Sequence, residues 1–179
     1  APAGYIVSSA GQTSATACSL GYYQASSGQT SCDAADAGYY VDLTGQSSQT
    51  ACATGTYQAS TGQSSCDDAD AGYYVSGTAQ SSQTVCAVGT YQASTGQSSC
   101  DDADAGYYVS GTAQTSQTAC AAGTLSSTPG SSSCTDAPAG YIVSSAGQTS
   151  ATACNAGSYQ ASSGQTSCDA AEEGHYVSG

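Results

Sequence analysis

The 179-residue chain contains no lysine and no arginine, and its thirteen Asp and Glu residues give a net charge of −13. Proteins that bind nucleic acids hold the phosphates with basic side chains, so this composition excludes a nucleic-acid partner. An anionic membrane surface would repel the chain for the same reason. No apolar run approaches the roughly 20 residues needed to cross a bilayer. We therefore expect neither nucleic-acid binding nor membrane insertion.

Large apolar side chains are equally scarce. Phe, Trp and Met are absent, and leucine occurs only at positions 20, 43 and 125. A chain with this composition cannot fill the core of a globular domain. The fourteen tyrosines and ten cysteines must supply the order instead.

A fixed period organises the chain. Glycine recurs with a 17-residue period from Gly4 to Gly174, and a shorter and a longer spacing alternate between successive cysteines, which gives a 34-residue period. Residues 1–35 match residues 137–171 except at three positions, which indicates a 136-residue super-repeat. Such periods are typical of repeat architectures, in which each unit contacts its neighbours rather than a common core. The predicted 34-residue repeats are 1–34, 35–68, 69–102, 103–136 and 137–170, followed by the start of a sixth repeat at 171–179.

The two 17-residue halves of each period differ in their cysteines. Ala35 occupies the position of Cys52 in the next half, and Gln49 occupies the position of Cys66, so the two cysteines are lost together. Ala69 with Gln83, Ala103 with Gln117 and Ala137 with Ala151 repeat the exchange. Loss in pairs favours disulfides across the shorter of the two cysteine spacings over disulfides across the longer one. The predicted bridges are Cys18–Cys32, Cys52–Cys66, Cys86–Cys100, Cys120–Cys134 and Cys154–Cys168.

Short strands and turns are the expected secondary structure. The pattern Gly-x-Tyr followed by Ser-Thr-Gly is typical of strand, turn and strand, and no helical apolar period is present. The predicted fold is all-β and disulfide-rich, an elongated tandem array of 17-residue β-hairpin-like units. Because side chains alternate faces along a strand, we expect Tyr40 to point inward and Tyr39 and Val41 to share the other face. We expect that second face to pack on a neighbouring unit or on another chain.

Cysteine usage predicts the compartment. All ten cysteines belong to the period, which favours disulfides formed in an oxidising, extracellular environment. No close C-x-x-C pair supports a zinc site. The chain starts and stops partway through a repeat, and we interpret it as part of a longer secreted protein.

Two kinds of surface residue are candidate sites. Ser and Thr make up 54 of the 179 residues, and a secreted chain this rich in hydroxyls is commonly O-glycosylated, with Ser60, Thr61, Ser94 and Thr95 in turns as candidates. Acidic clusters follow the second cysteine of each pair and give weak calcium candidates, against the alternative of a solvated corner. The calcium candidates are Asp67, Asp68, Asp70, Asp101, Asp102 and Asp104.

Nothing in the sequence assembles a catalytic centre. His175 is the only histidine and replaces a tyrosine, so we interpret it as a surface substitution. The serines have no histidine or lysine base to activate them. We expect neither an enzyme nor a cofactor.

The motif Cys52-x-x-Gly55-x-Tyr57, continued by Gly62-Gln63-x-x-Cys66, resembles the cysteine-rich ephrin-receptor-like repeat. That family usually has cysteines in every 17-residue unit, whereas this chain has them in alternate units. The resemblance implies an extended extracellular rod of the kind found in large secreted proteins of algae and protists, including mastigoneme-type filament proteins. The leading hypothesis is a structural component of an extracellular filament or surface fibre, O-glycosylated and bound to copies of itself or to other fibre subunits. The alternative is the stalk of an extracellular adhesion or receptor protein.

Overall fold

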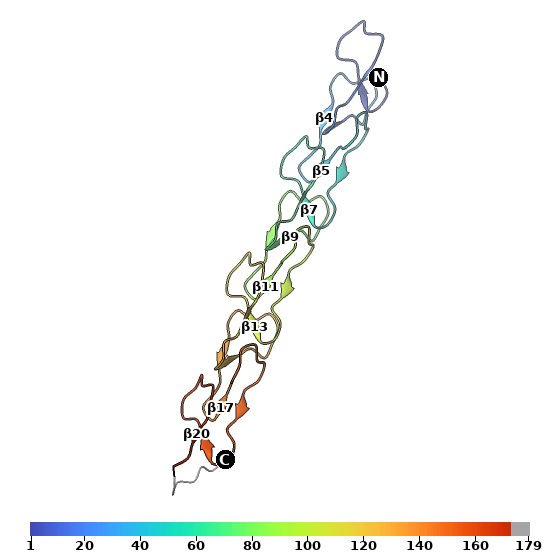
Figure 1. Ribbon diagram of the computed structural model, residues 1–179. Helices are drawn as coiled ribbons and strands as arrows, with labels where there is room; N and C mark the ends of the chain where they lie inside the picture. Colours follow the sequence, from blue (N-terminus) through green and yellow to red (C-terminus); the bar gives the residue numbers. More distant parts are fainter. Residues whose placement is uncertain (173–179) are drawn as a thin grey trace. The chain divides into compact units, whose positions relative to one another are not determined.

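A computed structural model describes residues 1–172. The chain is all-β over these residues, with ten antiparallel two-stranded hairpins, five disulfides and no helix (Figure 1). Each hairpin occupies one 17-residue repeat, and its two strands are joined by nine residues. The tandem hairpin array predicted from the sequence is therefore confirmed.

Each strand is two residues long. The strands are β1 (Tyr5–Ile6), β2 (Thr16–Ala17), β3 (Tyr22–Tyr23), β4 (Asp33–Ala34), β5 (Tyr39–Tyr40), β6 (Thr50–Ala51), β7 (Thr56–Tyr57), β8 (Asp67–Asp68), β9 (Tyr73–Tyr74), β10 (Thr84–Val85), β11 (Thr90–Tyr91), β12 (Asp101–Asp102), β13 (Tyr107–Tyr108), β14 (Thr118–Ala119), β15 (Thr124–Leu125), β16 (Thr135–Asp136), β17 (Tyr141–Ile142), β18 (Thr152–Ala153), β19 (Ser158–Tyr159) and β20 (Asp169–Ala170). Consecutive strands pair within each hairpin, for example Tyr39 with Ala51 and Tyr40 with Thr50.

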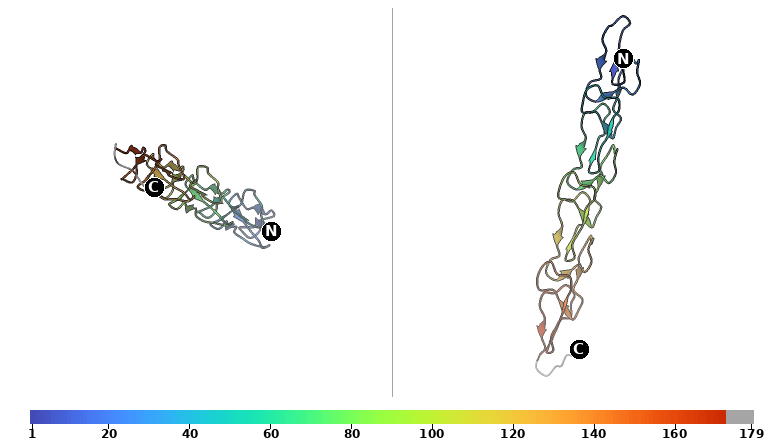
Figure 2. Two further views of the ribbon diagram at one scale, coloured as in Figure 1. Left: turned by 90° about the horizontal axis from the view of Figure 1, so that it is seen from below. Right: turned by 90° about the vertical axis from the view of Figure 1, so that its right-hand side faces the viewer.

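The chain divides into two compact units. The first comprises Ala1–Val85 with Ser94–Ser99, and the second comprises Cys86–Ala93 with the chain from Cys100 onward. Each unit contains five hairpins, which follow one another in chain order (Figure 2). Two consecutive hairpins fall within each of the stretches 1–34, 35–68, 69–102, 103–136 and 137–170.

A β-turn introduces the first strand of each hairpin. The Tyr39 N–H donates to the Asp36 carbonyl at 3.0 Å, with Gly38 at the third position of the turn and a φ of +85°. A positive φ at this position is the requirement of a type II turn, and glycine meets it without steric cost. The 17-residue glycine period therefore marks the same turn in successive repeats.

Backbone hydrogen bonds join consecutive repeats inside each compact unit. Repeat 35–51 is joined to repeat 52–68 by Gly38 N–H to Gln58 O (2.8 Å), Val41 N–H to Gln63 O (3.0 Å) and Gly62 N–H to Ala35 O (2.7 Å). In the second unit the equivalent bonds are Gly106 to Ser126, Val109 to Ser131 and Gly130 to Ala103. Because a two-stranded hairpin alone is marginal in water, these bonds between repeats are needed to order it.

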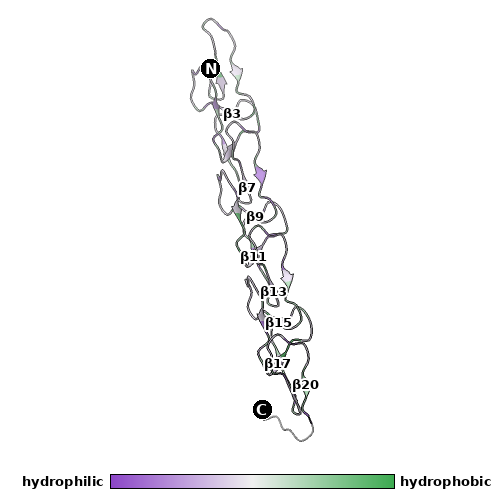
Figure 3. Ribbon diagram, turned by 90° about the vertical axis from the view of Figure 1, so that its left-hand side faces the viewer, coloured by the Kyte–Doolittle hydropathy of each residue, from purple (hydrophilic) through white to green (hydrophobic). Residues whose placement is uncertain are grey.

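The core is narrow and built from small side chains. Val41 is 2% exposed, Ala35 and Cys52 are fully buried, and Gln58 is 6% exposed. Figure 3 accordingly shows only short hydrophobic segments along the ribbon of either unit. The expectation that Tyr40 points inward was wrong: Val41 is the buried residue, whereas Tyr39 and Tyr40 are both half-buried. A nine-residue connection between two-residue strands lets the chain bend at Val41, so the strand alternation ends there.

Contacts also reach the second repeat along the chain. A Cβ placed on Gly55 would overlap the carbonyl oxygen of Gly96, and one placed on Gly106 would overlap that of Gly147. These partners lie two repeats away, so the expectation that each repeat contacts only its neighbours was incomplete. Glycine is required at Gly55 both by the turn and by this close approach of backbone.

We predict that Gly55→Ala will be far more damaging than Gly28→Ala. Both glycines have a positive φ, which costs alanine about 1 kcal/mol, but a Cβ at Gly28 meets nothing within 4 Å. At Gly55 the clash with rigid backbone should bring the total to about 2–4 kcal/mol. The chain already carries Ala79, with a φ of 55°, at the position equivalent to Gly28. Amide hydrogen exchange on the two variants measures the difference, and equal losses of protection would contradict the close approach.

Candidate functional site

The disulfides join cysteines within single repeats. The structure contains Cys18–Cys32, Cys52–Cys66, Cys86–Cys100, Cys120–Cys134 and Cys154–Cys168, with Cα atoms 5.7–5.8 Å apart. The first cysteine of the first four pairs is 0–1% exposed, and the second is half-buried. Each bridge ties the first residue of a repeat to the residue before its second strand.

A buried glutamine accompanies the disulfide in most bridged repeats. The Gln58 amide nitrogen donates to the Ser65 carbonyl at 3.0 Å and lies 3.4 Å from an Asp67 carboxylate oxygen. The Gln58 amide oxygen accepts the Ser60 N–H at 3.0 Å. The described residues contain no buried side-chain nitrogen or oxygen without a partner, so this polar core is fully satisfied.

Three of the repeats without a disulfide close their hairpin with a different pair. The Gln83 amide oxygen accepts the Asp70 N–H, and the Gln83 amide nitrogen donates to the Asp70 carboxylate, both at 2.6 Å. Gln49 with Asp36 and Gln117 with Asp104 make the same two bonds. We call this pair the Gln–Asp clamp. Its glutamine stands at the position that the second cysteine occupies in a bridged repeat, so the clamp closes nearly the same loop as the disulfide.

Sequence reasoning missed the clamp, although a signal was present. The two remaining repeats without cysteines carry Pro2 with Ala15 and Pro138 with Ala151 at the clamp positions. Asp and Gln are therefore present together or replaced together. This paired replacement is the same signal that predicted the disulfides, and it identifies the clamp as well.

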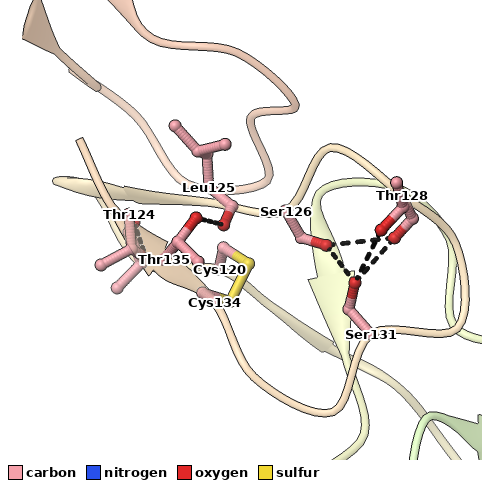
Figure 4. The surroundings of a disulfide bond; sticks show 9 residues. Cys120, Thr124, Leu125, Ser126, Thr128, Ser131, Cys134 and Thr135 are labelled. Atoms are coloured by element: carbon pink, nitrogen blue, oxygen red, sulfur yellow. Dashed lines mark hydrogen bonds between the residues drawn. A yellow bond between two sulfur atoms is a disulfide. The ribbon is translucent and has the colours of Figure 1, made fainter. Parts of the chain in front are cut away.

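The repeat 120–136 has its own variant of the polar core (Figure 4). Ser126 replaces the buried glutamine and donates to the Ser131 hydroxyl at 2.7 Å, and Ser131 donates to the Thr128 carbonyl at 2.8 Å. Thr135 stands where the other bridged repeats have aspartate, and its hydroxyl donates to the Leu125 carbonyl at 3.2 Å. The aspartate and the glutamine that it would contact are thus exchanged together.

The structure does not bring the calcium candidates together. Asp70 and Asp104 belong to clamps, and Asp67 and Asp101 lie beside buried glutamines. Asp68 and Asp102 lie beside the turns at Gly96 and Gly130. In residues 1–172 no three His, Cys, Asp or Glu side chains form a group that could hold a metal ion. These carboxylates are instead distributed along strands and turns. The only histidine, His175, lies outside the described residues.

A shallow groove occurs at equivalent positions in the two compact units. In the first unit it lies between Tyr40 of one repeat and Cys66 of the next, and in the second between Tyr108 and Cys134. Each groove has a volume of about 440 Å³ and is lined by alanine, threonine and serine as well.

The glycosylation candidates Ser60, Thr61, Ser94 and Thr95 are all exposed on the loops between paired strands.

No protein-family model and no curated protein matches the chain. In the described part of the chain, no helix has the length and apolar character needed to cross a membrane. The repeated hairpins resemble a structural module rather than an enzyme, and disulfides are typical of extracellular proteins.

Peptide mapping of recombinant protein can test the disulfides. A protease that cleaves after acidic residues should release residues 43–67 and 71–101 as separate peptides, each containing one internal bridge. Trypsin is unsuitable because the chain has no Lys or Arg. Bridges across the longer cysteine spacing would instead join the two peptides through Cys66 and Cys86, and recovery of that linked species before reduction would contradict the structure.

The Gln–Asp clamp predicts a local loss of stability in Gln83→Ala. Removing both hydrogen bonds should destabilise repeat 69–85 by about 1 kcal/mol and speed hydrogen exchange at the Asp70 amide. Gln80→Ala is the matched control, because the Gln80 side chain bonds only to the Thr78 carbonyl in its own loop. A similar change in both variants would show that the clamp contributes nothing specific.

Proposed function

We propose that this chain is part of a structural component of an extracellular filament or surface fibre, O-glycosylated and associated with copies of itself or with other fibre subunits. The observation that carries the proposal is the backbone bonding of each repeat to the next within both compact units. Repeats bonded in this way transmit tension through hydrogen bonds as well as through the covalent chain. The resemblance of the bridged repeat to the ephrin-receptor-like repeat supports the same role.

The distribution of chemistry supports a structural role over a catalytic one. The buried polar residues of the described part of the chain serve hairpin closure, as Gln58 does, and the more exposed Gln–Asp clamp serves the same purpose. Disulfides stabilise such a chain outside the cell. Each bridge joins cysteines with a sequence separation of 14 and contributes about 3 kcal/mol to the free energy of unfolding in the chain-entropy model. An uncharged sugar layer would hydrate the surface and separate chains that carry the same negative charge.

Electron microscopy of native material tests the fibre. We expect regular filaments whose axial repeat corresponds to whole 34-residue repeats, and an intact mass that exceeds the polypeptide by many hexose-sized steps. Recombinant protein made without glycosylation is the control for mass. Soluble monomers ending in a non-repeat head would contradict the fibre and favour an adhesion or receptor stalk, whereas a native mass equal to that of the polypeptide would remove the glycosylation.

A further inference from the structure

One pair of hydroxyl residues recurs in every 17-residue repeat. Nine and ten residues after each turn glycine stand a Ser or Thr and then a Ser, which we call the hydroxyl pair. The ten pairs are Thr13-Ser14, Thr30-Ser31, Ser47-Ser48, Ser64-Ser65, Ser81-Ser82, Ser98-Ser99, Thr115-Ser116, Thr149-Ser150, Thr166-Ser167 and Ser132-Ser133. All twenty side chains are exposed. An exposed position that merely needs to be polar would accept other residues, so its constancy requires another cause.

The loop tips provide the comparison within the same chain. Ser60-Thr61 lies at the tip of its loop, yet the equivalent residues are Leu43-Thr44, Gly77-Thr78 and Thr128-Pro129 in other repeats. The hydroxyl residues of these tips are also exposed, but the tips lose one of their hydroxyls repeatedly. A requirement for a hydroxyl therefore applies to the hydroxyl pair and not to the tips.

At the two grooves, the hydroxyls of the hydroxyl pair make no hydrogen bond within the fold. The Ser65 carbonyl accepts the Gln58 amide, which any residue could provide through its backbone. Among the described residues, no hydrogen bond involves the hydroxyls of Ser64, Ser65, Ser132 or Ser133. Serine hydroxyls both donate and accept, so these four remain available to chemistry outside the chain.

Each pair contributes to a groove that a tyrosine also lines. Ser64 and Ser65 line the groove of the first unit with Tyr40, and Ser133 lines that of the second with Tyr108. Figure 4 shows Thr124 and Cys134, which also line the second groove. A volume of about 440 Å³ lies within the range of small-ligand sites, and the lining of small side chains leaves it open.

The chemistry of the groove favours a neutral sugar. An acidic ligand would meet a chain of net charge −13 without a single Lys or Arg. A neutral sugar can place its apolar face against the tyrosine ring and direct its hydroxyls to water or to Thr56 and Asp42. A sugar attached to Ser64 or Ser65 starts from the groove wall, so its first residue is held beside Tyr40 by the covalent bond.

We propose that the hydroxyl pair, rather than the loop tip, is the O-glycan attachment site of each repeat, and that the first neutral sugar on Ser64-Ser65 and on Ser132-Ser133 is seated in the groove against Tyr40 or Tyr108. This inference rests on the proposed O-glycosylation and assigns it a site and a sugar class. It replaces the loop-tip serines and threonines as the principal acceptors.

Native protein, reduced and cleaved after acidic residues, provides the test. The peptide 43–67 contains both kinds of site, so fragmentation that preserves glycans can assign the sugar to Ser64-Ser65 or to Ser60-Thr61. We expect sugars on the hydroxyl pair in this peptide and at Ser132-Ser133. Sugars confined to loop tips would overturn the inference and leave the glycosylated fibre standing, whereas an unmodified peptide would remove the glycosylation as well.

Tyrosine nitration tests the seating of the sugar on intact protein. We expect Tyr40 and Tyr108 to be protected in native material and to gain nitration after the glycans are removed under conditions that leave the disulfides intact. Tyr22 is the matched control, since it is 40% exposed and does not line either groove. Equal nitration of Tyr40 before and after deglycosylation would overturn the seating.

Discussion

The close approach of one backbone to another is the constraint on which the structure depends. At Gly55 the space that a side chain would occupy holds the carbonyl oxygen of Gly96 from the second repeat along, so only glycine fits. The same glycine closes the β-turn with a positive φ and donates its N–H to the Val75 carbonyl of the next repeat. One residue type therefore determines the turn, the hydrogen bond between consecutive repeats and the spacing of alternate repeats. The 17-residue period follows, since any insertion would move the glycine away from its partners.

Because backbone contacts set the spacing of the repeats, the side chains have only to close each hairpin. The chain closes its hairpins in two ways. Bridged repeats combine a disulfide with a buried polar residue such as Gln58, whose amide ties the loop to Ser65 and Ser60. Three of the repeats without a bridge combine a buried valine with the Gln–Asp clamp. Both solutions use small or polar side chains, which is consistent with a chain that has no Phe, Trp or Met. They differ in their response to the environment, because reduction opens only the first kind of closure.

The acidic residues have a different role from the one their clustering suggests. Their carboxylates accept hydrogen bonds from glutamine amides or lie beside turns, and the groups that could have formed a cation site are separated along the repeat. The hydroxyl residues differ from the carboxylates in this respect. At the two grooves, the hydroxyls of the hydroxyl pair, which recurs in every repeat, make no hydrogen bond. In a structural repeat protein, groups left unused by the fold are the ones available to bind or carry something else. The serines rather than the carboxylates are therefore the residues available to bind or carry another group.

The period, the all-β hairpin array and the cysteine pairing could all be predicted from the amino-acid sequence, because each of these is a relation between positions that recur and are exchanged together. The sequence could also have revealed the Gln–Asp clamp, since Pro2 with Ala15 and Pro138 with Ala151 replace both partners at once. Three features became visible only in the folded structure: Val41 rather than Tyr40 is buried, the second strand begins after Cys66, and Gly55 meets a carbonyl two repeats away. Strand alternation could not settle these points, because two-residue strands joined by nine-residue connections take their direction from the neighbouring repeats. The grooves beside Tyr40 and Tyr108 are likewise formed between repeats, and no pattern within a single repeat contains them.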